Sequence, residues 1–195
     1  MNLKWIMISQ SVVLFGTGIV FPFYILFLKE VGANFSEFGI AYGLFTLSAA
    51  FVHKWIGRMS DKFGRRIFLI VNAWGTAVLF LFFPIVTSIW QLYTLQIILG
   101  IIGAMQKTSE KAIIADVTEG NSRGELIGTY HFWVSIFSGL AVIFSGFIID
   151  FLTIDLIFYF GSIILFISGW LTLNIEERNN KGIQMTVSNN TVNKQ

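Results

Sequence analysis

Residue types that carry enzyme chemistry are scarce in this chain of 195 residues. There is no cysteine, which excludes a disulfide scaffold, a thiolate metal site and a cysteine nucleophile. The two histidines, His53 and His131, are too few to favour a zinc centre. No paired carboxylates, no phosphate-binding glycine loop and no Ser/His/Asp set on one aqueous surface can be found. We therefore expect no enzyme activity, no catalytic residue, no metal ligand and no cofactor.

The densest group of functional side chains is the segment Gly57–Arg66, with the sequence GRMSDKFGRR. This composition predicts a tight cytoplasmic turn, in which Gly64 permits a backbone conformation that other residues resist. Its basic residues would lie at the anionic inner leaflet, and Asp61 would be favoured by the positive end of a helix dipole. Any basic loop would account for the cations, but not for two glycines and one aspartate at this spacing. The candidate switch residues are Gly57, Asp61, Lys62, Gly64, Arg65 and Arg66.

Two stripes of polar and small residues each share one helix face. In the first apolar run, Gln10, Thr17 and Tyr24 recur every seven positions. In the fourth run, steps of four and three separate the residues Gln96, Gly100, Gly103, Lys107 and Glu110. Both stripes could line a solute pathway, or they could serve helix packing, because glycines allow close approach and amides hydrogen-bond neighbouring helices. For Gln10 and Gln96 both interpretations stay open.

Glu110 is the acidic residue that lies closest to the middle of an apolar run. An ionisable residue within the membrane is a functional candidate. The alternative, which we favour, is an i, i+3 pair between Lys107 and Glu110 in the headgroup region, with Lys111 extending to the interface. We expect Asn72 to be structural and His131 to be a hydrogen-bonded packing residue.

The elements that must position these residues are membrane-spanning helices. The chain is 55% hydrophobic, 16% aromatic and only 12% charged, whereas a soluble domain carries about 25% charged residues. A spanning helix needs about 20 mostly apolar residues, and the alternating segments of a membrane barrel are missing. We predict an all-α membrane protein with six transmembrane helices, at Trp5–Leu28, Phe38–Trp55, Ile67–Val86, Trp90–Lys107 (extending at most to Ile114), Leu126–Ile149 and Ile154–Leu173.

The placement of charge predicts the topology. Of the thirteen basic residues, all but Lys29 fall on one side of the predicted membrane, while the acidic Asp150 and Asp155 lie in a loop on the other side. Basic residues near the ends of spans stay in the cytoplasm. We therefore expect a multi-pass protein of the plasma membrane with both termini in the cytoplasm.

Two domains are expected from composition. Residues 1–174 would form the six-helix bundle, and residues 175–195, rich in Asn, Lys and Thr, would form a polar, disordered cytoplasmic tail. Because the basic residues lie at the membrane edge, nucleic-acid binding has no support. The lipid bilayer is the first expected partner.

The segment Gly57–Arg66 resembles the signature of the major facilitator superfamily, Gly-x-x-x-Asp-(Arg/Lys)-x-Gly-(Arg/Lys)-(Arg/Lys), at every specified position. A second segment, residues 115–128, resembles the family's loop between helices four and five. The resemblance covers roughly residues 1–175 and matches the amino-terminal six-helix half of the family's twelve spans. Such a half consists of two three-helix units of inverted topology, and Gly57/Asp61 and Gly146/Asp150 repeat one spacing at the ends of spans two and five.

What the resemblance implies is transport of a small solute by alternating access, with helices one and four lining the central pathway. It also implies a second six-helix bundle, supplied by a homodimer or by a separate half. The substrate is not specified, and drug or metabolite efflux is one option. The alternative is a non-transporting membrane protein, either a truncated half or an assembly or regulatory subunit. Because Gln96 stands where proton-coupled members carry Arg, we expect facilitative transport, or coupling through groups of another chain.

Overall fold

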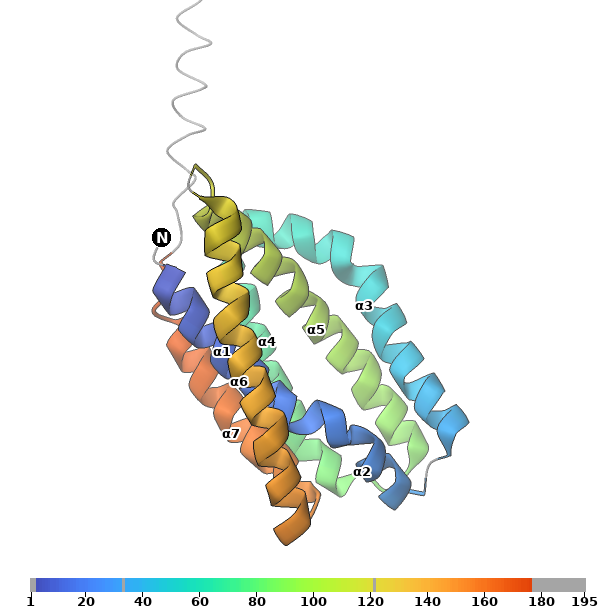
Figure 1. The fold of residues 1–195 in the computed structure, drawn as a ribbon. Helices are drawn as coiled ribbons and strands as arrows, with labels where there is room; N and C mark the ends of the chain where they lie inside the picture. The colour runs from blue at the N-terminus through green and yellow to red at the C-terminus, as the bar shows by residue number, and fades with distance from the viewer. Residues whose placement is uncertain (1–2, 33, 121, 177–195) are drawn as a thin grey trace, which may run out of the picture.

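The computed structural model describes residues 3–32, 34–120 and 122–176, and these are helical over most of their length (Figure 1). Six segments are long and apolar enough to cross a membrane, which confirms the predicted all-α fold with six spans. The long elements are α1 (Leu3–Val20), α3 (Phe35–Phe63), α4 (Arg65–Phe82), α5 (Ile89–Val117), α6 (Arg123–Phe151) and α7 (Asp155–Thr172). The short ones are η1 (Phe21–Phe23), α2 (Tyr24–Glu30) and η2 (Phe83–Ile85).

Both prolines lie in a 3₁₀ turn where an α-helix ends. The first predicted span is not one continuous helix, because Pro22 lies in the 3₁₀ turn η1 between α1 and α2. Proline lacks a backbone N–H, and its ring clashes with the carbonyl group four residues earlier. Pro84 acts in the same way in η2, directly after α4. The first span therefore bends between Thr17 and Tyr24, which had been expected to share one straight face.

Three helices extend beyond their predicted ends. The helices α3, α5 and α6 each have 29 residues, roughly 43 Å, whereas the hydrocarbon core is about 30 Å thick. The apolar runs end where charged residues begin, but the helices continue through them. The predicted turn over Gly57–Arg66 is therefore wrong in its extent. It is helical except at Gly64, which has φ +98° and joins α3 directly to α4.

The helix contacts follow a two-fold pattern. The helix α1 packs against α6 and α7, and α5 packs against α3 and α4. Exchanging the first three spans with the last three converts one set of contacts into the other, and the contact between α4 and α7 maps onto itself. These contacts are those expected of two three-helix units of inverted topology. In Figure 1 the start of α1 and the end of α7 lie at the same end of the bundle.

Three clusters of buried apolar residues fill the interior of the bundle, and the two larger ones lie toward its opposite ends. At the end of the bundle where α2 meets α3, which we call the outer end after the predicted topology and whose opposite we call the inner end, aromatic rings pack edge-to-face and in stacks. The rings of Phe83 and Phe158 are 4.9 Å apart. At the inner end, Ile6, Tyr130 and Ile175 are fully buried together. The packed chain thus reaches one residue past the predicted bundle boundary at 174, and residues 177–195 of the predicted tail lie outside the described residues.

Candidate functional site

A cavity of about 410 Å³ lies between α1, α2, α3, α4 and α5, and we call it the central groove. Most of its exposed wall is aliphatic and aromatic, and polar groups come from Thr17, Asn72, Thr76, Gln96, Gln106, Lys107 and Glu110. Its volume is in the range of small-molecule sites, which are mostly apolar with a few placed polar groups. The stripe residues that line it are Thr17, Tyr24, Gln96, Gly103, Lys107 and Glu110.

Two members of the predicted stripes do not line the groove. Gly100 faces α3, where an added Cβ atom would overlap the Ser48 hydroxyl oxygen and the Phe45 carbonyl oxygen. Its role in the structure is close helix packing, which spacing alone could not distinguish from that of Gly103. Gln10 is fully buried behind the groove wall and accepts a hydrogen bond from Gln106.

At the outer end of the groove, Gln96 donates a hydrogen bond from its amide nitrogen to the Tyr24 hydroxyl oxygen. This bond connects α5 to α2 just beyond the proline break. The Tyr24 ring also contacts Phe83, with ring centroids 6.0 Å apart. The stripes of the first and fourth spans therefore meet here, through one buried hydrogen bond that is surrounded by aromatic rings.

A chain of five buried or half-buried polar side chains lies at the inner end of the groove. Asn72 of α4 donates to Gln106 Oε1 over 2.9 Å. Gln106 Nε2 donates to Gln10 Oε1 of α1 and to Glu110 Oε2, the latter over 3.3 Å. Tyr130 of α6 donates its hydroxyl proton to Glu110 Oε1. We call Gln10, Gln106, Asn72 and Glu110, with Tyr130, the polar chain.

The expected pair of Lys107 and Glu110 is not formed, so that interpretation is wrong. Both Glu110 oxygens accept hydrogen bonds from Tyr130 and Gln106, and no basic side chain among the described residues forms an ion pair with Glu110. The Lys107 nitrogen lies 5.9 Å from the centroid of the Phe45 ring. Glu110 is also seven residues inside α5 rather than at its end.

The segment Gly57–Arg66 forms a second cluster, at the inner end of the bundle. Arg65 donates from Nη2 to Asp61 over 3.3 Å, and its Nη1 contacts Asp116 Oδ2 and the Ala112 carbonyl oxygen of α5. Arg66 donates to the Ile175 carbonyl oxygen over 3.1 Å. These two arginines therefore bind protein groups at this end of the bundle.

Asp61 lies in the last turn of α3, so the helix dipole that was expected to favour it acts against it there. Its stabilising partner is Arg65. The Asp61 side chain remains 67% exposed. Lys62 is exposed beside the Phe63 ring. Gly57 faces the Thr108 side chain of α5. The Thr108 hydroxyl oxygen is hydrogen-bonded to His53 Nδ1 over 2.8 Å.

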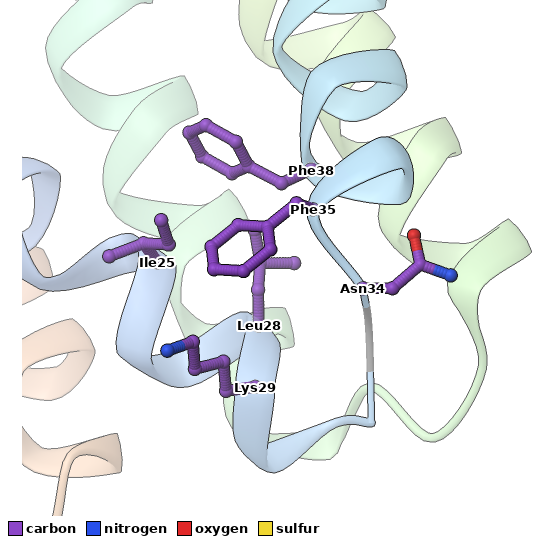
Figure 2. Close-up of a pocket in the computed structure, with 6 residues that line it drawn as sticks. All are labelled: Ile25, Leu28, Lys29, Asn34, Phe35 and Phe38. Atoms are coloured by element: carbon purple, nitrogen blue, oxygen red, sulfur yellow. The ribbon is translucent and has the colours of Figure 1, made fainter.

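A smaller pocket lies at the outer ends of α2 and α3 (Figure 2). Figure 2 shows the Lys29 side chain beside the Phe35 ring, with Asn34 pointing away from both; the Lys29 nitrogen is 5.2 Å from the ring centroid. Its volume of about 50 Å³ is too small for a solute, since one water molecule occupies about 30 Å³. The central groove is therefore the candidate site.

Sequence reasoning missed Gln106 and Tyr130 and classed Asn72 as structural. Gln106 precedes Glu110 by four residues, so i, i+4 spacing could have linked them. The contact of Tyr130 with Glu110 joins α6 to α5 and has no local signal in the sequence.

Comparison with known proteins identifies the family. The family model described as Major Facilitator Superfamily matches residues 6–190. The chain belongs to the major facilitator superfamily. It is 46% identical over 159 residues to the uncharacterized MFS-type transporter YitZ of Bacillus subtilis (strain 168). The aligned region covers 82% of this chain and 97% of YitZ.

Other members of the superfamily are longer than the region they share with this chain. The tetracycline resistance protein, class B, of Escherichia coli is 30% identical over 131 residues, which cover 66% of this chain and 31% of that protein. The multidrug resistance protein MdtG of Proteus mirabilis (strain HI4320) is 26% identical over 163 residues, which cover 81% of this chain and 40% of that protein. Together with the six spans, these matches define a multi-pass membrane protein of a transporter family.

Proposed function

We propose that this chain forms one six-helix half of a transporter that moves a small, largely apolar solute across the plasma membrane by alternating access. The central groove carries this proposal. It combines the volume of a small-molecule site with an apolar wall and a few placed polar groups. In transporters built from inverted repeats, the solute site lies between the repeats. No enzymatic role is included, because a transporter family accounts for the chain.

The wall of the groove favours a solute with aromatic or aliphatic surface. Phe45, Phe80 and Phe83 line it together with Tyr24 and Tyr42. Polar selection would come from Gln96 at the outer end and from Lys107 and Glu110 at the inner end. Two relatives carry tetracycline and multidrug resistance in their names, which supports export as the direction of transport.

A second six-helix bundle completes the pathway in this proposal. Among the six spans, α3 and α6 have the smallest fraction of residues buried within this bundle, counted over the most apolar stretch of each span. Their exposed faces carry large side chains, including Phe51 on α3 and Phe147 on α6. Lys107 would meet lipid if the groove stayed open, and a charge in the hydrocarbon region costs at least about 2.5 kcal/mol. The partner bundle is a second copy of this chain or a separate half.

The competing proposal is an inserted protein that does not transport. The match covers 97% of YitZ, so a chain of about this span also occurs in a relative. Such a chain would act as a half without a partner or as an assembly subunit. Stoichiometry distinguishes the two proposals, because only the transporter requires two bundles per unit.

The test is transport in proteoliposomes with a panel of radiolabelled apolar, cationic and zwitterionic compounds, with each preparation's stoichiometry measured by native mass spectrometry. The matched variants are Gly103→Trp, which fills the groove, and Ile163→Trp on the exposed face of α7. Transport that Gly103→Trp abolishes and Ile163→Trp preserves supports the proposal. A two-bundle preparation that moves no compound, or transport that is unaffected by Gly103→Trp, contradicts it.

A further inference from the structure

Lys107 is a cation without a counter-ion in the central groove. Among the described residues that line the groove, it is the one basic side chain. No acidic side chain of the described residues forms an ion pair with it. Its ammonium group has three N–H donors, and its recorded contact is the Phe45 ring, whose centroid lies 5.9 Å away. That distance is at the outer limit of a cation–π contact, about 6 Å, so the donors are available to a solute.

Glu110, the acidic residue of the groove, does not neutralise this cation. It lies three positions further along α5, and its two carboxylate oxygens accept hydrogen bonds from Tyr130 and Gln106. A cationic solute would have to compete with these two donors for Glu110. An anionic solute would find the Lys107 ammonium group without a competing acceptor. The arrangement of polar groups in the groove therefore favours an anion over a cation.

Aromatic rings of α3 extend from Lys107 toward the outer end of the bundle. The Phe45 ring stacks on Tyr42 with centroids 6.1 Å apart, and Tyr42 stacks on Phe38 with centroids 6.3 Å apart. The seven positions from Phe38 to Phe45 correspond to about 10 Å of helix. Tyr42 and Phe45 both line the groove. An anionic group at Lys107 would therefore place an attached apolar body along these rings.

The spacing of α5 limits the length of such a body. Gln96, which is hydrogen-bonded to Tyr24 at the outer end, precedes Lys107 by eleven positions, or about 16 Å of helix. We propose that Lys107 binds the anionic group of the transported solute, and that this solute is an amphipathic organic acid with an aromatic or aliphatic body no longer than about 16 Å. This inference rests on the proposed function, because it names the substrate class of the same groove.

The experiment measures binding by fluorine NMR to the full chain in phosphatidylcholine nanodiscs, with empty nanodiscs as the background. Three probes share a 4′-fluorobiphenyl body and carry a carboxylate, a carboxamide or an aminomethyl group at the other end. Their heads are anionic, neutral and cationic. We expect the acid to bind about ten- to a hundredfold more tightly than the amide or the amine, which is the range for a hydrogen bond to a charged group.

Three variants assign this preference to one side chain. Lys107→Gln should lower the affinity for the acid to that for the amide, and unchanged affinity for the amide would show that the groove is intact. Lys107→Arg keeps the charge and should keep the preference. The matched control is Lys111→Gln, which removes an exposed cation one turn further along α5, at a position that does not line the groove. It should also keep the preference.

The proposal is overturned if the acid does not bind, or if the amide or the amine binds as tightly as the acid. It is also overturned if Lys107→Gln retains the preference. A lipid headgroup is another source of an anion, and phosphatidylcholine alone presents no net negative charge. If added phosphatidylglycerol removes the preference, the anion that Lys107 binds is a lipid headgroup, and the assignment to a solute fails.

Gly103→Trp, which fills the groove, separates failure of this inference from failure of the proposed function. Loss of binding of all three probes in Gly103→Trp, together with no effect of Lys107→Gln, would overturn the inference and leave the groove as the solute site. Binding that survives Gly103→Trp would place the probes outside the groove and contradict both.

Discussion

Arg65, the first residue of α4, forms an ion pair with Asp116, the penultimate residue of α5. The pair connects the junction between α3 and α4 to a helix 51 residues further along the chain. Arg65 also holds the Ala112 carbonyl oxygen, and its side chain is only 21% exposed. The signature segment thus acts within this half as a clamp on the inner end of α5.

A double-mutant cycle on this clamp measures its strength. Arg65→Ala and Asp116→Ala should each lower the free energy of unfolding, and the coupling energy should be about 1 kcal/mol, at the upper end of the range for exposed pairs. Arg58→Ala, which removes an exposed cation of α3, is the matched control and should have little effect. The measurement is denaturation in mixed micelles. A coupling energy near zero would contradict the clamp.

The exposed member of the cluster should behave differently. Asp61→Asn removes one carboxylate that is 67% exposed, so membrane insertion and stability should change little. In the proposed two-bundle transporter it should shift the balance between cytoplasmic-side conformations several-fold, which cysteine cross-linking between bundles can measure. An unchanged cross-linking pattern together with full transport would show that Asp61 does not influence the change between conformations.

Substitutions at Gly100 and Gly103 of α5 should distinguish a glycine needed for helix packing from one that lines the central groove. Gly100→Ala would place a methyl group against Ser48 and Phe45, and it should cost about 1–3 kcal/mol of stability, as overpacking does. Gly103→Ala meets the Phe45 ring at 3.5 Å, an ordinary contact, and should be tolerated. Thermal unfolding of both variants in detergent provides the comparison. Equal losses would show that the close contact at Gly100 is not limiting.

The spans could be predicted because hydropathy alone defines them. The two inverted three-helix units could be predicted from the resemblance to the family. The helix ends could not, because α3 continues through Lys54 and Arg58 although its apolar run ends there. Within the site, Gly100 and Gly103 have the same spacing signal but face different surroundings. The bond between Tyr130 and Glu110 depends on how α6 meets α5, which no local pattern encodes.

The topology remains a prediction with a direct test. A reporter fused after Gln195 should be active in the cytoplasm, and one inserted between Asp150 and Asp155 should lie outside, because twelve of thirteen basic residues fall on one side. Paired alkaline phosphatase and fluorescent-protein fusions report both locations. Labelling of the 150–155 loop from the cytoplasm alone would require a different orientation.

The central claim is that the groove is a solute pathway, and single-cysteine accessibility tests it most directly. The chain has no cysteine, so an introduced thiol has no background. Thr17→Cys and Gly103→Cys line the groove, whereas Ile163→Cys lies on α7 at a position that is 57% exposed in the bundle and expected to face lipid. A membrane-impermeant maleimide reacts with the thiolate, which forms in water and not in hydrocarbon. The account predicts rapid labelling at both groove positions and little at Ile163; equal labelling at all three positions, or none in the groove, would contradict it.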